Sequence, residues 1–172
     1  ARIFLYLVHA QIHRKARCHK IARLFNPHPH DRRPIETPCI VGRLPFALTL
    51  AREEDCKVYA TARNGEALNA LAEEAAKDGG TGSVEPCVLD QSDDDAVKAF
   101  VQEIDAKESC VDLLVNSAFG GLIAMTPHFG KPFWERPFSV FDASIEIGLR
   151  SAHVMSALVA PIMVKNKSGL MV

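Results

Sequence analysis

The pattern of hydrophobic and polar positions becomes regular only after about residue 40 of the 172-residue chain. Beyond that point, apolar residues recur at helical spacing in "PFALTLAREED", in "NGEALNALAEEAAKDGG", in the segment that Ser92 begins, and roughly from Val140 to Val164. Shorter apolar segments separate these predicted helices: "KVYATAR", which alternates as a half-buried strand does, "SVEPCVLD", the continuously apolar "VDLLVNSA", and "KSGLMV". The alternating order predicts an α/β protein with a parallel sheet and helices on its faces.

The first part of the chain follows no such pattern. Residues 1–36 hold five of the seven histidines and carry eight cations against two carboxylates, a net charge of +6, whereas the rest of the chain carries −7. Prolines at positions 27, 29, 34 and 38 oppose regular structure where this part ends. We therefore predict an irregular, basic, His- and Pro-rich tail and linker over residues 1–38, outside the fold, and a partial folded domain over residues 39–172.

Composition limits the class of protein. Hydrophobic residues make up 48% of the chain and charged residues 24%, values typical of a globular protein. No apolar run approaches the roughly 20 residues of a membrane-spanning helix, so we expect no membrane span. The five cysteines are odd in number and widely spaced, which is typical of reduced thiols inside the cell. We expect a cytoplasmic protein; the alternative is import into an organelle through the Arg-rich, acid-poor start of the chain.

The tail also raises the question of metal or nucleic-acid binding. Its histidines, with Cys18, offer imidazole and thiolate ligands, and its cations could meet phosphates. The ligand spacing is irregular, however, and no aromatic stacking platform accompanies the charges. We therefore expect neither a metal site nor a nucleic-acid partner.

Polar residues end three of the predicted strands. Arg63 follows "YATA", Asp90 follows "PCVL" and Asn116 follows "LLV". A guanidinium binds phosphate through two hydrogen bonds, a carboxylate accepts from ring amines, and an amide bridges strands or a ligand. Each residue also has a plainer explanation, namely solvation, capping of the next helix, or satisfaction of backbone groups. Because parallel strands end at one edge of a sheet, three such groups in register favour a ligand site.

These segments resemble the short-chain dehydrogenase/reductase family. The similarity covers about Phe46 to Val172 and rests on "VYATAR", "PCVLDQSDDDAV", "VDLLVNSAFGG" and "KPFWERPFSVFDASIEIGLRS". Members of this family have a Rossmann fold, which is a doubly wound parallel sheet, and move a hydride between NAD(P) and a carbonyl or alcohol. The resemblance therefore implies a Rossmann-like α/β oxidoreductase fold, a nicotinamide dinucleotide as ligand, and a homodimer paired through the long helix.

The same resemblance implies roles for single residues. Asp90 falls where the family contacts the adenine ring, Asn116 where neighbouring strands are tied together, and Ala118 beside the cofactor ribose. Ser117 stands in this cofactor wall in place of the usual second asparagine. Arg63 lies where the family often contacts the 2′-phosphate, which favours NADP over NAD.

The phosphate-binding turn of the family is incomplete. Its Thr-Gly-x-x-x-Gly-Ile-Gly pattern is matched only by Gly42, as the final glycine, in "ETPCIVGRLPFALTL". "RIFLYLV" is the candidate for a first strand, and it lies too far upstream for a short turn around a phosphate. We therefore expect the first strand-and-helix unit to be absent or replaced, neighbouring strands to expose apolar edges, stability to be marginal, and cofactor binding to be weakened or lost.

The catalytic residues of the family are missing as well. The family uses a serine and a Tyr-x-x-x-Lys motif, in which the lysine lowers the pKa of the tyrosine. Tyr6 and Tyr59 are the two tyrosines of this chain, and neither has a lysine four residues later. We predict no catalytic residue here and a partial oxidoreductase that is inactive by itself. The alternative is a non-catalytic protein that keeps the fold to bind a nucleotide or a partner subunit.

Overall fold

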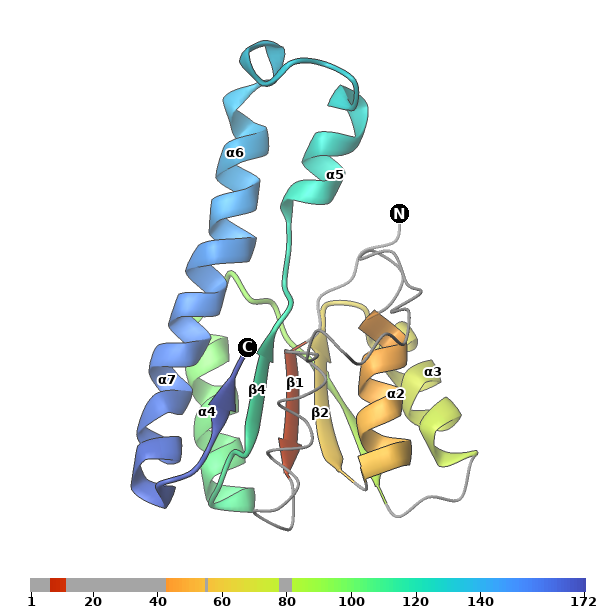
Figure 1. Cartoon of the computed structure of the whole chain (residues 1–172), viewed down its shortest axis with the longest axis vertical. Helices are drawn as coiled ribbons and strands as arrows, with labels where there is room; N and C mark the ends of the chain where they lie inside the picture. Colours follow the sequence, from red (N-terminus) through yellow and green to blue (C-terminus); the bar gives the residue numbers. More distant parts are fainter. Residues whose placement is uncertain (1–6, 12–42, 55, 78–81) are drawn as a thin grey trace, which may run out of the picture.

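The computed structural model describes residues 7–11, 43–54, 56–77 and 82–172, and strands and helices alternate along this part of the chain (Figure 1). The strands are β1 (Leu7–Gln11), β2 (Lys57–Ala62), β3 (Ser83–Val88), β4 (Leu113–Asn116) and β5 (Leu170–Met171). The α-helices are α2 (Arg43–Glu54), α3 (Gly65–Ala76), α4 (Asp94–Glu108), α5 (Gly121–Met125), α6 (Phe138–Ser144) and α7 (Ser151–Asn166). The 3₁₀ turns Thr126–His128 and Phe133–Glu135 lie between α5 and α6, and the π-helical segment Ile145–Arg150 joins α6 to α7.

The strands form one sheet in the order β3-β2-β1-β4-β5. β2 and β3 pair in parallel, as do β4 and β5, whereas β1 is antiparallel to both of its neighbours. β2, β3, β4 and β5 therefore all run in one direction, and their carboxyl ends lie at the same edge of the sheet. This arrangement confirms the predicted α/β fold with parallel strands.

The central strand comes from the region predicted to be a tail. β1 includes part of "RIFLYLV", and its Val8 lies opposite both Ala60 of β2 and Val115 of β4. For these five residues the prediction of a tail outside the fold is wrong, and the edges of β2 and β4 that face each other are paired instead of exposed. The physical reason is that an empty central position would leave two rows of backbone groups without partners, which a short extended segment satisfies. The first strand is thus replaced by one of opposite direction.

Helices cover both faces of the sheet. Side chains of α2 and α3 form one core with β2 and β4, and side chains of α4 and α7 form a second core on the opposite face. In β2, Val58 and Ala60 belong to the first core and Tyr59 to the second, and five of the six residues of the strand are buried. The predicted half-buried strand is therefore buried on both faces, because it lies inside a sheet that is covered on both sides.

Side-chain caps fix where two helices begin. The Asn64 side chain accepts from the backbone of Ala67 at 3.2 Å and starts α3, and Asp93 accepts from Ala96 at 3.0 Å and starts α4. The sequence pattern started this helix with Ser92 and the three aspartates that follow it, and of these four residues Asp93 is the cap. The two glycines that close "NGEALNALAEEAAKDGG" lie outside the described residues, and the helix itself ends at Ala76.

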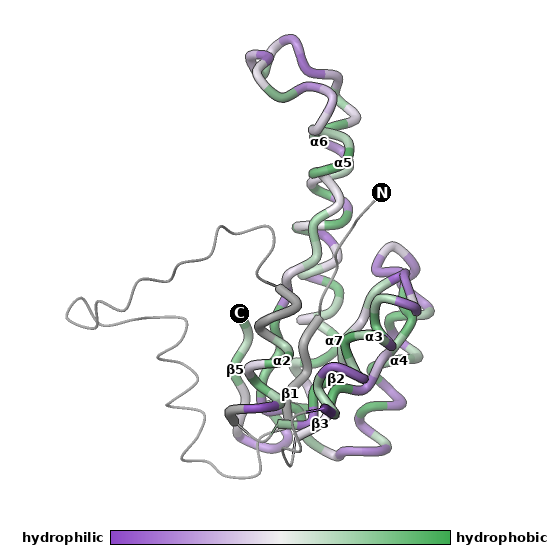
Figure 2. Tube along the Cα trace, turned by 90° about the vertical axis from the view of Figure 1, so that its right-hand side faces the viewer, coloured by the Kyte–Doolittle hydropathy of each residue, from purple (hydrophilic) through white to green (hydrophobic). Residues whose placement is uncertain are grey.

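The predicted long helix is broken near its middle. The helical stretch runs from Phe138 to Asn166, and the φ of −101° and ψ of 29° at Ile147 are not helical. Beyond the break, α7 packs its buried residues against α4 and the sheet. Before it, α6 buries Val140 alone of its seven residues, and α5 and α6 form a hairpin that projects beyond the sheet (Figures 1 and 2). The break therefore separates a core helix from a projecting one.

The same stretch has the length and composition of a membrane span. Among the described residues, Phe138–Asn166 alone meets these two criteria. A core helix meets them equally well, and α7, which makes up the second half of the stretch, lies in the second core.

Candidate functional site

The structure brings the predicted strand-end residues to one edge. Arg63 follows β2, Asp90 lies two residues beyond β3, and Asn116 ends β4. Because these strands run in the same direction, the three residues lie at the carboxyl edge of the sheet, where ligands bind in open α/β folds. The positive charge of Arg63 acts on Asp90 and contributes to the lowered pKa of its carboxyl group. We call this edge, with Arg63, Asp90 and Asn116, the strand-end site.

Asn116 ties three elements together and keeps one polar atom free. Its backbone N–H donates to the carbonyl of Val172 at 2.7 Å, and its Nδ2 donates to Ser156 Oγ on α7 at 3.1 Å. Its Oδ1 is buried and has no hydrogen-bond partner in the part of the chain that the structure describes. A buried acceptor without a partner is costly, so this oxygen is suited to an N–H or O–H from a ligand.

Asp90 is held by the turn that follows β3. Its Oδ1 accepts from the backbone N–H of Ser92 at 2.9 Å and from Ser92 Oγ at 2.7 Å. The backbone hydrogen bond from Ser92 is the main cause that lowers the pKa of Asp90 below its ordinary value. The plainer explanation, a local structural role, thus accounts for one oxygen, and the carboxylate stays ionised at the edge.

Arg63 differs from Asp90 and Asn116 because no hydrogen bond from the described residues fixes its side chain. The residue is exposed, and its guanidinium makes no hydrogen bond or ion pair with any described part of the chain. A free guanidinium at the end of a strand keeps its full set of donors for an anion.

The segment after β4 continues the site. Ser117 and Ala118 are half-buried, as are Phe119 and Gly120. The backbone N–H of Gly120 donates to the carbonyl of Ile147 at 3.2 Å, at the break in the long helix. A Cβ on Gly120 would lie 2.8 Å from Cβ of Ile147, so glycine is required for this close approach. The break therefore frees a helix carbonyl that fixes the loop after the strand.

The remaining predicted residue, Gly42, lies outside the described residues. The helix that follows it, α2, is described from Arg43 onwards. α2 ends two residues before β2 begins, so its Arg43 end lies towards the strand-end site. β1 runs the other way, and its Gln11 end lies at the opposite edge of the sheet. A short turn from β1 to α2 at the strand-end site is therefore excluded, and the described residues offer no glycine cradle for a pyrophosphate.

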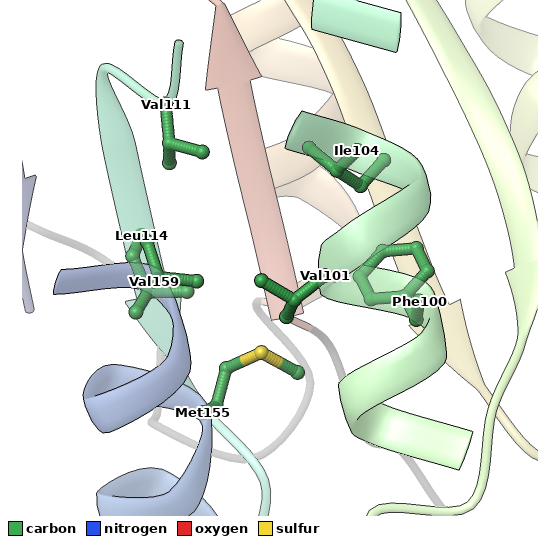
Figure 3. A pocket seen from close by; sticks show the side chains of 7 residues that line it. All are labelled: Phe100, Val101, Ile104, Val111, Leu114, Met155 and Val159. Atoms are coloured by element: carbon green, nitrogen blue, oxygen red, sulfur yellow. The ribbon is translucent and has the colours of Figure 1, made fainter. Parts of the chain in front are cut away.

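A second feature, a small apolar void, lies in the core and not at the edge. Seven side chains of α4, β4, α7 and the turn before β4 line it (Figure 3): Phe100, Val101, Ile104, Val111, Leu114, Met155 and Val159. Its volume of about 10 Å³ is roughly the smallest that can hold one water molecule, and no polar side chain lines it. The void is a packing defect and is too small for a substrate.

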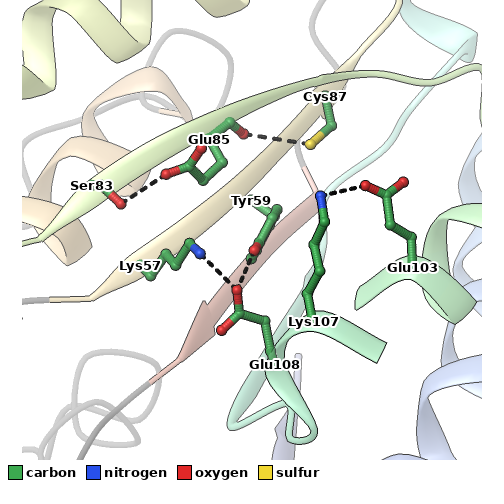
Figure 4. Close-up of polar contacts among 8 residues, drawn as sticks. All are labelled: Lys57, Tyr59, Ser83, Glu85, Cys87, Glu103, Lys107 and Glu108. Carbon is green, nitrogen blue, oxygen red and sulfur yellow. Dashed lines mark hydrogen bonds and ion pairs between the residues drawn. The ribbon is translucent and has the colours of Figure 1, made fainter. Parts of the chain in front are cut away.

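Tyr59, the tyrosine within the described residues, has a structural position. Its hydroxyl donates to Glu108 Oε1 at the end of α4, which also accepts from Lys57 Nζ at 2.7 Å (Figure 4). Burial raises the pKa of Tyr59, and the hydrogen bond to Glu108 raises the pKa of Lys57. Lys57 and Tyr59 lie in the first half of β2, whereas the strand-end site lies where β2 ends. The cluster joins α4 to the sheet and does not approach the site.

Cys87 is also part of this face of the sheet. Its thiol donates to the carbonyl of Glu85 at 3.7 Å, and burial raises its pKa to about 11 (Figure 4). A thiol with so high a pKa stays protonated at neutral pH, which makes it a poor nucleophile.

The sequence did not reveal the contacts that support the site. Ser156 lies forty residues from Asn116, and nothing in the spacing of the sequence links them. Arg150 and Asp94, which join α4 to the start of α7 through two hydrogen bonds of 2.8 and 2.7 Å, lie 56 residues apart in sequence. The glycine pair at Gly120 was the one signal available, since adjacent glycines after a strand often mark a close approach of backbones.

Comparison with known proteins places this fold in a family. The model of the short chain dehydrogenase family matches residues 45–172, and the chain belongs to that family of oxidoreductases. It is 36% identical over 116 residues to "Dehydrogenase/reductase SDR family member 1" of Mus musculus, which covers 67% of this chain and 36% of the relative. It is 30% identical over 123 residues to "3-oxoacyl-[acyl-carrier-protein] reductase FabG" of Thermotoga maritima, which covers 72% of this chain and 46% of that protein.

Solved structures agree with this assignment. A metagenomic short-chain oxidoreductase in complex with NADP superposes with a TM-score of 0.57 at 31% identity, over 67% of this chain and 48% of that one. A 7α-hydroxysteroid dehydrogenase complexed with NADH and 7-oxo glycochenodeoxycholic acid gives a TM-score of 0.54 at 30% identity, over 66% and 40%. The chain thus spans less than half the length of these relatives.

Proposed function

We propose that this chain binds NADP or NAD through the strand-end site and does not transfer hydride by itself. The observation that carries the proposal is the placement of a free guanidinium, a carboxylate and an unpaired buried amide oxygen at the carboxyl edge of three strands. Two solved relatives hold NADP and NADH, which supports a nicotinamide dinucleotide as the ligand.

The residues present fit one end of such a cofactor. Asp90 and Arg63 would hold the adenosine, with the adenine at the carboxylate and a 2′-phosphate at the guanidinium, which favours NADP. Asn116, Ser117 and Ala118 would line the wall beside them, and the bound cofactor would supply hydride chemistry. The pyrophosphate lacks its glycine cradle among the described residues, so we expect weaker binding than a complete dinucleotide fold achieves.

We infer the lack of hydride transfer from the residue types present among these 172 residues. Tyr59 is held by Glu108 at the far end of β2, and neither tyrosine of the chain belongs to a Tyr-x-x-x-Lys motif. Without a lysine to lower its pKa, a tyrosine is a poor proton donor at neutral pH. The proposal is therefore of nucleotide binding without turnover.

Isothermal titration with NADPH and NADH tests the proposal, with Arg63→Gln and Lys77→Gln as a matched pair. Both cations are exposed, and they flank α3 at opposite edges of the sheet. We expect NADPH to bind the unaltered chain more tightly than NADH. Arg63→Gln should lower the affinity for NADPH by about tenfold or more, because it removes a charge-assisted hydrogen bond. Lys77→Gln should change neither affinity. Absence of binding, or equal effects of the two substitutions, would contradict the proposal.

A second candidate function, subunit interaction through the long helix, has its own support. Large apolar side chains are exposed along this helix: Phe141 (66%), Leu149 (66%) and Val164 (74%). Exposed apolar rows on helices are frequent at subunit interfaces. Light scattering tests this homodimer by measuring the molar mass of the unaltered chain and of the Leu149→Ser variant. The hypothesis requires a dimer mass for the unaltered chain and a monomer mass for the variant.

A further inference from the structure

The end of the projecting hairpin exposes several large aromatic side chains. Residues 126–138, here called the aromatic tip, comprise the connection from α5 to α6 and the first residue of α6. Within the tip, Phe129, Phe133, Trp134 and Phe138 are exposed by 59%, 77%, 73% and 89%. None of the four is a core residue, so folding of the described part does not explain them. Exposed apolar patches of this kind mark sites of interaction with another protein or with a membrane.

The aromatic tip is nevertheless an ordered loop. The backbone N–H groups of Lys131 and Arg136 donate to the carbonyls of His128 and Phe133 at 3.2 Å each. Arg136 Nε donates to the carbonyl of Lys131 at 3.0 Å, and the rings of Phe133 and Trp134 meet edge to face at 5.3 Å. Much of the polar backbone is thus satisfied locally, which a loop requires before it enters a medium that contains little water.

The charge and shape of the aromatic tip indicate what kind of partner covers it. Lys131 and Arg136 lie among the aromatic residues and outnumber the one carboxylate, Glu135. Lys131 is exposed and forms no ion pair within the described ranges. Figures 1 and 2 show the tip at the far end of a narrow hairpin, and Figure 2 shows hydrophilic and hydrophobic residues alternating around it. A narrow convex end offers little area to a second protein, whereas a lipid bilayer deforms around it.

We propose that the aromatic tip docks on a lipid bilayer with anionic headgroups. Trp134 lies among the headgroups, where its amphipathic ring is favoured, Phe133 and Phe138 reach the upper acyl chains, and Lys131 meets lipid phosphates. The cytoplasmic leaflet carries the anionic lipids, and the location expected from the sequence gives access to it. This surface is separate from the strand-end site, so the proposal goes beyond nucleotide binding and does not depend on it.

The chain carries its own reporter for this contact, because Trp134 is its single tryptophan. Fluorescence is measured while vesicles of phosphatidylcholine, with or without phosphatidylserine, are added to the full chain. We expect the emission of Trp134 to shift to shorter wavelength and to be quenched by brominated acyl chains. The shift should appear at lower lipid concentration when phosphatidylserine is present, and it should not depend on protein concentration.

Substitutions distinguish insertion of the aromatic tip from nonspecific hydrophobic binding to vesicles. Replacing Phe133 and Phe138 together by serine should weaken vesicle binding in co-sedimentation by about tenfold or more, because two buried aromatic groups are lost. Val88→Ser is the matched control: it removes an apolar side chain that is 69% exposed but lies on β3, in the body of the protein. The control should bind vesicles like the unaltered chain. Arg63→Gln should do so as well, which keeps this test independent of the nucleotide site.

Two results would overturn the proposal. The first is a Trp134 emission that vesicles of either composition leave unchanged while the far-ultraviolet circular dichroism shows a folded chain. The second is a blue shift that grows with protein concentration in the absence of lipid, because it would assign the tip to a second copy of the chain. The removed side chains are exposed, so the variants should keep the urea midpoint of the unaltered chain.

Discussion

The body of the protein and its projecting hairpin use apolar residues in opposite ways. In the body, helices on both faces of the sheet bury the side chains of β2 and β4 almost completely. In the α5–α6 hairpin, α6 buries one residue of seven, and Phe138 at its start is 89% exposed. The two regions are continuous through one helical stretch, which breaks at Ile147. An apolar pattern therefore predicts a core only where another element faces it.

The largest expected contrast comes from deleting one apolar side chain in each region. Leu114→Ala in β4 removes a fully buried side chain from the core that the sheet shares with α4 and α7, and we expect a loss of about 2–5 kcal/mol in the free energy of unfolding. Phe138→Ala in the hairpin should change it by about 0.5 kcal/mol or less. Urea denaturation followed by circular dichroism measures both. Equal losses would show that the hairpin is packed like the body.

The replaced central strand makes a second contrast. Val8→Pro removes a backbone N–H from a strand that pairs on both sides, and each buried backbone group left unpaired costs about 1–3 kcal/mol. Val8→Ala keeps the N–H and is the control for the side chain. A lower urea midpoint for the proline variant than for the alanine variant is expected. Identical midpoints would mean that residues 7–11 do not hold the centre of the sheet.

A smaller effect concerns pH and the cluster at the start of β2. The hydrogen bond to Glu108 raises the pKa of Lys57 above its ordinary 10.5, and burial raises that of Tyr59 above 10.0. Both shifts favour the protonated form in the folded state. Their contribution to stability is therefore complete below these ordinary values and is lost as the pH rises through the higher folded-state pKa values.

Glu108→Gln should reduce that alkaline loss. The amide still accepts from Tyr59 but has no charge to hold the Lys57 ammonium, and at neutral pH the change should cost about 1 kcal/mol or less for a partly exposed pair. Urea midpoints between pH 8 and pH 11, chosen to bracket the ordinary pKa values, measure the effect. An unaltered chain whose midpoint stays constant over this range would contradict the assignment. Lys107→Gln, at an exposed pair on the same helix, is the control.

Much of the body could be predicted from its pattern. Segments such as "VDLLVNSA" and the Asp93 region carry strong local signals, since a continuous apolar run fits a strand buried on both faces and acids suit the start of a helix. "RIFLYLV" was the candidate for a first strand, but the position and direction of β1 could not be predicted, because its pairing depends on a vacancy between β2 and β4 that no local signal records. The break at Ile147 was missed for a similar reason, since the apolar spacing predicts one continuous helix and the hydrogen bond from the Gly120 N–H to the Ile147 carbonyl is long-range.

The candidate site was predictable as a set of strand ends and not as a set of contacts. Arg63, Asp90 and Asn116 were found because strand direction alone brings them to one edge. The link from Asn116 to Ser156 and the unpaired Oδ1 depend on how α7 packs, which the sequence does not encode locally. Gly42 lies outside the described residues, and its place in a phosphate turn stays a prediction.

Nuclear magnetic resonance with 2′,5′-ADP, compared with 5′-AMP, tests the central claim most directly, because the first ligand carries the phosphate that Arg63 would bind. We predict that 2′,5′-ADP shifts the backbone amides of Arg63, Asp90 and Ser117 while the Trp134 indole in the hairpin stays unchanged, and that 5′-AMP shifts Arg63 less. Shifts confined to the hairpin, or equal responses of Arg63 to the two ligands, would contradict the account.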